Sequence, residues 1–247
     1  MKIKVLENSI ELGNAAAKYS ADIIKEAISQ KGKARIVLST GASQFDTLKA
    51  LINENISWDK VEMFHLDEYI GLPESHPASF RKYLKERFLE KVNIMKSWLI
   101  DGENNIKEVI AVLTDELRKE PIDIGLIGIG ENAHIAFNDP PADFETKEAF
   151  ICVDLNETCK QQQVREGWFA KTDDVPMQAI SMSVYQIMQC KYIVSCVPGI
   201  VKAQAIKDTL ESPLSNKVPA TMLKEHPNAV IYLDKKSASM IDSGKYA

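Results

Sequence analysis

Cysteine is scarce in this sequence and has none of the spacings that bind metals. Only four cysteines occur among 247 residues, with no Cys-x-x-Cys pair, and their surroundings are apolar or mixed. In a chain of this length such a pattern predicts reduced, largely structural thiols rather than a disulfide framework or a zinc site. The four are Cys152, Cys159, Cys190 and Cys196.

Long apolar runs and an excess of basic charge are also missing. No run of about 18 apolar residues occurs, and the N-terminus lacks the apolar region of a signal peptide. We therefore expect a cytoplasmic protein with no membrane partner. The formal net charge is −5 and the pI about 5.5, which leaves no basic footprint for nucleic acid. An anionic ligand would need a local cationic pocket.

The sequence does contain a regular alternation of strand and helix signals. Hydrophobic residues make up 45% of the chain, enough for a substantial core, and no repeat or linker interrupts it. Helical periodicity covers 10–30, 45–52, 77–90 and 106–119. Strand-like runs cover 34–38, 61–66, 97–100, 122–129, 149–153, 178–183, 191–197 and 229–234. This alternation predicts one α/β domain, residues 1–247, with a mostly parallel sheet.

The rest of the chain is organised around the stretch 122–140. Its first half, 122–129, is almost continuously apolar, as in a central parallel strand that is covered on both faces. Such strands end at the crevice where open α/β sheets bind ligands. Asn132, His134 and Asp139 follow there, and an imidazole with polar neighbours is suited to proton transfer. The alternative is a structural, hydrogen-bonded histidine.

Two further segments have the pattern of anion sites. The loop Thr40, Gly41, Ala42, Ser43 joins a strand to a helix, so backbone N–H groups and the helix dipole could face an anion. It is not a Walker motif, and the alternative is an ordinary turn with Ser43 as the helix N-cap. Lys202, in the first turn of a later helix, opposes the dipole preference for acids. A bound anion or simple solvation would explain that lysine.

Two acidic residues, Asp67 and Glu68, end the strand 61–66. Adjacent side chains of an extended chain point to opposite sides, so only one can face a pocket as a general base. The other would tie down structure or lie in a solvated loop. The polar, amide-rich segment 154–178 includes Arg165 and a hinge-like Gly167. It predicts a mobile lid or, alternatively, a surface helix and loop.

Four motifs occur in the order seen in glucosamine-6-phosphate deaminases (isomerases), and the resemblance spans nearly the whole chain. They are STGAS at 39–43, FHLDEYIGLP at 64–73, GIGENAHIAFNDP at 128–140 and VPGIVKA at 197–203. The sequence thus resembles this family, to which 6-phosphogluconolactonases are related. The resemblance implies a modified Rossmann-like three-layer α/β/α fold. It also implies conversion of glucosamine 6-phosphate and water into fructose 6-phosphate and ammonia, without a metal or organic cofactor.

The resemblance further implies a role for each matching residue. Asp67 would take the proton from C2 of the opened sugar and return it at C1. His134 would assist ring opening, oriented and tuned by Asn132 and Asp139. The sugar phosphate, the expected small-molecule partner, would be held by Thr40, Gly41, Ala42, Ser43, Lys202 and Arg165. Assembly into a homo-oligomer is left open.

Three positions depart from the family pattern. Asn132 stands where Asp is usual, Asp139 replaces Glu, and Ala133 replaces Gly where the backbone would need a positive φ or close substrate approach. Three alternatives therefore remain: a deaminase for another hexosamine 6-phosphate, a 6-phosphosugar lactonase, and a non-catalytic sugar-phosphate sensor, although no helix-turn-helix output module is present. The chain ends at Ala247, without the extension that completes an allosteric site in some members, so no such regulation is expected.

Overall fold

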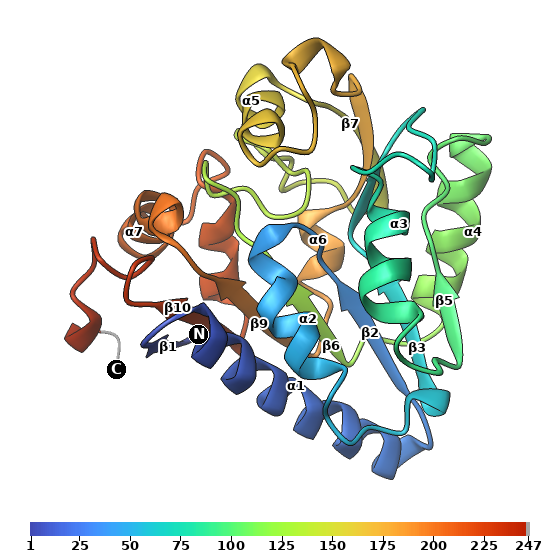
Figure 1. Cartoon of the computed structure of the whole chain (residues 1–247), viewed down its shortest axis with the longest axis horizontal. Coiled ribbons are helices and arrows are strands. Elements are labelled where there is room, and N and C mark those ends of the chain that lie inside the picture. The colour runs from blue at the N-terminus through green and yellow to red at the C-terminus, as the bar shows by residue number, and fades with distance from the viewer. Residues whose placement is uncertain (246–247) are drawn as a thin grey trace.

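A parallel sheet of seven strands forms the centre of the computed structural model, which describes residues 1–245 (Figure 1). The last two residues of the expected domain 1–247 lie outside that part. The strand order is β1-β10-β9-β6-β2-β3-β5, and every neighbouring pair is parallel. The strands are β1 (Lys2–Leu6), β2 (Ala34–Leu38), β3 (Val61–His65), β5 (Lys96–Trp98), β6 (Ile124–Ile127), β9 (Tyr192–Val197) and β10 (Ala229–Asp234).

Helices cover both faces of this sheet, which confirms the predicted three-layer arrangement. One core lies beneath α1 (Ser9–Lys31), α2 (Phe45–Leu51) and α3 (Phe80–Leu84). The other lies beneath α4 (Ile106–Arg118), α6 (Val184–Ile187) and α7 (Ala203–Glu211). Along β2, Ile36 and Leu38 belong to the first core and Val37 to the second, as the period of two in a strand requires. In Figure 1, α1 and α2 lie in front of the sheet.

The apolar run 122–129 occupies the place that its composition predicted. It contains β6, the fourth strand of seven, which has strands on both sides and no exposed residue. Because all strands are parallel, the chain leaves β2, β6 and β9 at the same edge of the sheet. The loops that follow these three strands are therefore brought together there.

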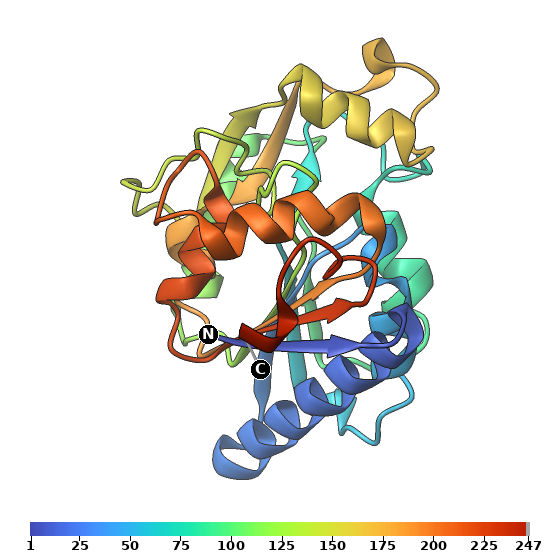
Figure 2. The same ribbon diagram turned by 90° about the vertical axis from the view of Figure 1, so that its left-hand side faces the viewer.

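A second, antiparallel sheet of three strands was not predicted. Its order is β4-β8-β7, with β4 (Asp67–Tyr69), β8 (Gln178–Met182) and β7 (Phe150–Asp154). The sequence indicated the last two strands but assigned them to the parallel sheet. Figure 2 shows this small sheet and α5 (Glu157–Arg165) above the main sheet. The short sheet fixes the position of Asp67, which pairs with Ser181 of β8.

Single helical turns complete the architecture. A π-helical segment, Lys85–Leu89, continues α3. Turns of 3-10 helix occupy 42–44, 58–60, 172–174, 200–202, 219–225 and 243–245. Two of them, 42–44 and 200–202, lead directly into α2 and α7 at the edge where β2 and β9 end.

Arg35 is the buried charged residue that joins β2 to the end of α4 and to β3, and we expect the stability of the fold to depend on it. Only 1% exposed, it donates to the carbonyl groups of Glu116, Leu117 and Glu120 at the end of α4, and its Nε lies 2.6 Å from Glu62 Oε2. Arg35→Met should cost about 3–5 kcal/mol in unfolding free energy, because the Glu62 carboxylate and the carbonyls lose their partner. Urea unfolding measures this cost.

The matched control for Arg35 is Lys107→Met, which removes an exposed cation from α4, the helix that Arg35 contacts. Its effect on the unfolding free energy should stay within about 0.5 kcal/mol. Equal losses for the two variants would show that the buried network contributes nothing specific.

Candidate active site

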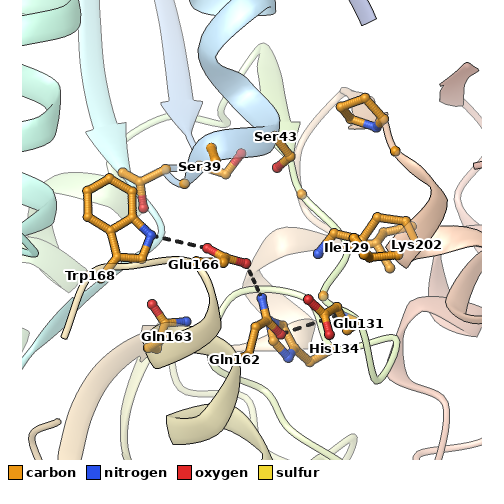
Figure 3. A pocket seen from close by; sticks show the side chains of 18 of the residues that line it. Ser39, Ser43, Ile129, Glu131, His134, Gln162, Gln163, Glu166, Trp168 and Lys202 are labelled. Atoms are coloured by element: carbon orange, nitrogen blue, oxygen red, sulfur yellow. Dashed lines mark hydrogen bonds between the residues drawn. The ribbon is translucent and has the colours of Figure 1, made fainter. Parts of the chain in front are cut away.

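A cavity of about 590 Å³ opens at the edge where β2, β6 and β9 end. Its lining includes nearly all the candidate residues: Thr40, Gly41, Ala42, Ser43, Asp67, His134, Arg165 and Lys202. The other two, Asn132 and Asp139, stand behind His134. Residues separated by more than 150 positions in the sequence thus share one cavity, and Figure 3 draws 18 of its lining side chains and labels ten of them.

His134 is held from three sides. Its Nδ1 lies 3.0 Å from Asp139 Oδ1, and the Asn132 amide donates to the same oxygen at 3.0 Å. The Asn132 carbonyl oxygen accepts the backbone N–H of His134 at 3.2 Å. A Cβ on Gly130 would lie 2.2 Å from His134 Cε1, so only glycine leaves room for the ring. The predicted partners of the histidine are thus adjacent to it.

The contact with Asp139 determines which nitrogen of His134 is available. The 3.0 Å distance is within hydrogen-bond range, although the N–H direction is not that of a hydrogen bond in this structure. An ionised carboxylate can only accept, so Asp139 favours the tautomer of the neutral ring with its proton on Nδ1 and Nε2 as the acceptor. Burial by itself would raise the pKa of the Asp139 carboxyl, but His134, Asn132 and Cys159 together hold it below its usual range. At position 132 an aspartate would set a second carboxylate against Asp139. Asparagine supplies an N–H donor instead.

The tight loop at Ala133 keeps a glycine-like backbone. Its φ is 63°, as the replacement of a family glycine suggested, and Ala136 nearby has φ 51°. Each such alanine costs roughly 1–2 kcal/mol relative to a right-handed conformation. Backbone hydrogen bonds from Ala133 N to Gly130 O and from Ala220 N to Ala133 O hold the loop in place.

Asp67 and Glu68 point in opposite directions, as predicted for neighbours on an extended chain. The Glu68 carboxylate is fully buried and accepts the N–H groups of Tyr69, Phe80 and Arg81 and the Ser79 hydroxyl. It therefore ties down structure, and the alternative of a solvated loop is wrong. Burial raises the pKa of Glu68 against the effect of these donors.

Asp67 lines the cavity but is only 7% exposed. Burial raises the pKa of its carboxyl to about 8, and the charge of Glu68 adds to the effect. The neighbouring His65 supplies no compensating positive charge, because burial lowers its pKa to about 3. Asp67 can therefore exchange a proton near neutral pH, which suits a general base that must also return the proton.

Two glycine-led loops form another wall of the cavity. Gly41 and Gly199 have nearly the same backbone conformation, with φ of 97° and 96°, and each precedes a 3-10 turn and then a helix. Ser43 lies inside the 3-10 turn, and neither the turn nor α2 has a side-chain hydrogen bond at its N-cap. The alternative of an ordinary turn with Ser43 as the N-cap is therefore wrong. The Ser43 hydroxyl is instead available to the cavity.

Lys202 brings a buried cation to these loops. It is 6% exposed, and within residues 1–245 its ammonium has no hydrogen-bond or ion-pair partner. Burial lowers its pKa, while the carboxylates of Glu166 and Glu131 act in the opposite direction. A buried cation without a close partner is costly, so this position favours an anionic ligand.

The segment 154–178 supplies α5, whose side chains reach over the cavity. Gln162 and Trp168 both donate to the Glu166 carboxylate, at 2.7 and 3.1 Å, and Figure 3 shows this carboxylate between them. Arg165 lines the cavity but its Nη2 lies 2.7 Å from Glu131 Oε2. Gly167, with φ 82°, ends the helical part. The segment is a helix and loop, as one alternative expected, and it also roofs the site.

Sequence reasoning missed several polar residues of the cavity. The Ser39 hydroxyl is buried without a hydrogen-bond partner in the described chain, and the 6%-exposed Gln163 has no side-chain partner there either. Ser39 could have been found as the residue that directly follows a strand. Gln163 was part of a recognised amide-rich run, but nothing in the sequence showed which side of its helix would face the cavity.

The four cysteines neither pair with one another nor contribute to a metal site in the described part of the chain. All four are unpaired, three are buried, and burial raises the pKa of Cys190 and Cys196 to about 12. Among residues 1–245, no three His, Cys, Asp or Glu side chains converge to hold a metal ion. In the same part of the chain, no helix combines the length and apolar character needed to cross a membrane.

Comparison with known sequences gives full-length matches. The family model described as glucosamine-6-phosphate isomerases/6-phosphogluconolactonase matches residues 7–232. A glucosamine-6-phosphate deaminase of Lactobacillus delbrueckii subsp. bulgaricus is 33% identical over 242 residues, covering 98% of this chain and 100% of the relative. One of Thermoanaerobacter pseudethanolicus is 34% identical over 249 residues, covering 98% and 95%.

Solved structures agree with these matches. A monomeric glucosamine-6-phosphate deaminase superposes with a TM-score of 0.87 at 32% identity, covering 98% of this chain and 100% of that one. A 6-phosphogluconolactonase of Thermotoga maritima has a TM-score of 0.79 at 15% identity and covers 95% and 99%, which shows the shared fold alone. This chain therefore belongs to the glucosamine-6-phosphate isomerase/6-phosphogluconolactonase family.

Proposed function

We propose that this chain converts glucosamine 6-phosphate and water into fructose 6-phosphate and ammonia. The observation that carries the proposal is one cavity with a poised carboxylate, Asp67, an imidazole–carboxylate pair, and two glycine-led loops beside a buried lysine. Full-length relatives named glucosamine-6-phosphate deaminase support the substrate. A lactonase would have no need of a proton acceptor such as Asp67 over C2.

Ring opening falls to His134 in this proposal. Nε2, left unprotonated by the Nδ1 contact with Asp139, accepts the proton of the O1 hydroxyl as the ring bond breaks. The imidazolium, facing the Asp139 carboxylate, then delivers a proton to the ring oxygen. The product is the open-chain aldehyde, with no net change at the histidine. Such proton transfers typically contribute 10²–10⁴-fold in rate.

Isomerisation falls to Asp67. In its ionised form it removes the C2 proton, which the neighbouring aldehyde acidifies, and the electrons form an enolamine. The protonated carboxyl then returns the proton to C1, which leaves an iminium at C2 and the negative charge on O1. One N–H proton passes to O1, so that C1 becomes a hydroxymethyl group and C2 an imine. Water adds to that carbon and ammonia leaves, which gives fructose 6-phosphate. A carboxyl with a pKa near 8 serves both directions better than one with an ordinary value.

The phosphate is expected to bind between the loops that start at Gly41 and Gly199, beside Lys202. Binding of this remote group would supply energy that positions the reacting carbons. Within the proposal, α5 acts as a lid hinged at Gly167, and Arg165 exchanges Glu131 for the phosphate on closure. The buried amide of Gln163 would hydrogen-bond a sugar hydroxyl. Because a phosphorylated sugar does not cross a bilayer, we place the reaction in the cytoplasm.

A panel of phosphorylated sugars tests the proposal. Glucosamine 6-phosphate should yield ammonia and fructose 6-phosphate in equal amounts, and turnover should exceed that of the galactosamine and mannosamine 6-phosphates. Preference for another hexosamine would keep the mechanism and change the substrate. Phosphogluconate formed from its lactone, without ammonia from any amino sugar, would indicate a lactonase. Tight sugar-phosphate binding with no product at all would indicate a sensor.

A further inference from the structure

Gln44 connects the loop that starts at Gly41 to the end of β9, the strand that precedes the loop at Gly199. It is 1% exposed and ends the turn 42–44 that follows β2. Its Nε2 lies 3.0 Å from Ser43 Oγ and 3.2 Å from the carbonyl oxygen of Cys196 on β9. Since β6 lies between β2 and β9 in the sheet, this side chain crosses the end of β6 to reach its second partner.

Gly128 provides the space for that crossing. It follows β6 directly, and a Cβ there would lie 3.3 Å from Gln44 Nε2, 3.9 Å from Ser39 Oγ and 4.0 Å from Ser43 Oγ. A side chain at position 128 would therefore crowd the Gln44 amide. Figure 3 shows the hydroxyl-bearing side chains of Ser39 and Ser43 on the same wall of the cavity.

The two contacts of the Gln44 amide determine the direction of the Ser43 hydroxyl. A backbone carbonyl can only accept, so the nitrogen and not the oxygen of the amide must face Cys196. The same NH₂ group donates to Ser43 Oγ, which therefore acts as an acceptor in that bond. The proton of the Ser43 hydroxyl then remains free to donate to a ligand. With the amide reversed, Ser43 would donate inward and present lone pairs to the cavity.

We infer that Gln44 is a positioning residue that, with its amide held by the Cys196 carbonyl, makes Ser43 a hydrogen-bond donor to the bound phosphate. The identity of the anion rests on the proposed function. Gln44 does not line the cavity, so it acts only through Ser43 and β9. Nothing in the motifs indicated this role, because it depends on a carbonyl 152 positions away.

Gln44→Met tests the inference by keeping the length of the side chain and removing both donors. The readouts are the affinity for inorganic phosphate, by calorimetry, and the kcat and KM for glucosamine 6-phosphate. We expect phosphate binding and KM to weaken by roughly threefold to tenfold, the equivalent of one hydrogen bond, with kcat within about twofold. Gln44→Glu, which can only accept from Ser43 and so reverses its hydroxyl, should weaken binding further.

A double-mutant cycle separates this role from general packing. Ser43→Ala should weaken phosphate binding, and Ser43→Ala with Gln44→Met should be no weaker than Ser43→Ala alone. Additive losses, or unchanged phosphate affinity in Gln44→Met, would overturn the inference. Gln186→Leu is the matched control, because Gln186 is also buried but lies outside the cavity. If phosphate responds as expected while no amino sugar is turned over, the proposed function fails and the positioning role stands.

Discussion

Asp67→Asn is expected to release no measurable ammonia from glucosamine 6-phosphate while remaining folded. The amide keeps the size of the carboxyl but cannot accept the C2 proton, so isomerisation stops at the open-chain sugar. Loss of an essential general base typically costs at least 10²–10⁴-fold. The measurement is coupled ammonia release, with circular dichroism to show that the fold is intact.

The pH dependence of kcat/KM in the wild-type enzyme should follow the ionisation of Asp67. Because burial raises the pKa of Asp67 to about 8, only a minority of the free enzyme carries the ionised base at pH 7. We expect kcat/KM to rise about tenfold per pH unit below pH 8 and to level off above it. A kcat/KM that stays constant from pH 6 to pH 9 would contradict the assignment.

The same shift predicts a gain in stability for the inactive variant. A carboxyl whose pKa is higher in the folded than in the unfolded state favours folding below its ordinary pKa, near 4. That contribution is lost as the pH rises from about 4 to about 8. Asp67→Asn does not titrate, so its melting temperature should exceed that of the wild type at pH 9 by an amount corresponding to a few kcal/mol. At pH 4 the two should be similar.

Glu68 provides the matched control for Asp67, since it is the adjacent acid and faces the other way. Its carboxylate accepts hydrogen bonds from Ser79 and Arg81, so Glu68→Gln should lower stability. Because the charge of Glu68 is the smaller of the two causes that raise the pKa of Asp67, the variant should keep the rising pH profile and move it only slightly to lower pH. If the rise of kcat/KM with pH disappeared in Glu68→Gln while activity remained, the titrating group would be Glu68 and not Asp67.

The main sheet could be predicted because its strands carry a local signal. The run that contains β6 is apolar on both sides because both faces are covered, and this is visible residue by residue. The small sheet could not, because its pairing is non-local. Asp67 on β4 pairs with Ser181 on β8, and nothing in either segment specifies the other. The start of α2 at Phe45 was predicted correctly, but the 3-10 turn 42–44 before it was not, so Ser43 lies inside a turn and is not the N-cap.

The candidate site was predictable to the level of which residues converge, but not of which atoms meet. His134 and Asp139 were expected to be neighbours, and they are 3.0 Å apart. The Asn132 amide donates to the Asp139 carboxylate and not to the imidazole, because the left-handed backbone at Ala133 sets its direction. The side of α5 that faces the cavity depends on how its other side, including Cys159, packs into the apolar cluster around Tyr69.

Gly130→Ala should reduce turnover about as much as removing the histidine itself. The added Cβ would lie 2.2–2.4 Å from three ring atoms of His134, far inside van der Waals contact, so the imidazole must move. Displacement breaks its 3.0 Å contact with Asp139, although every catalytic group remains chemically intact. We expect kcat to fall by about 100-fold to 10,000-fold, the usual range for a misplaced general acid–base. Overpacking should also cost about 1–3 kcal/mol of stability.

A comparison with His134→Ala separates displacement of the ring from damage to the loop. With the imidazole gone, the methyl group at position 130 has room, so the double variant should be no less active than His134→Ala alone and should regain most of the lost stability. If the two losses multiplied instead, Gly130 would matter for the loop backbone and not for the ring. Non-additivity would establish that this glycine is required because the imidazole occupies the space where a side chain would be.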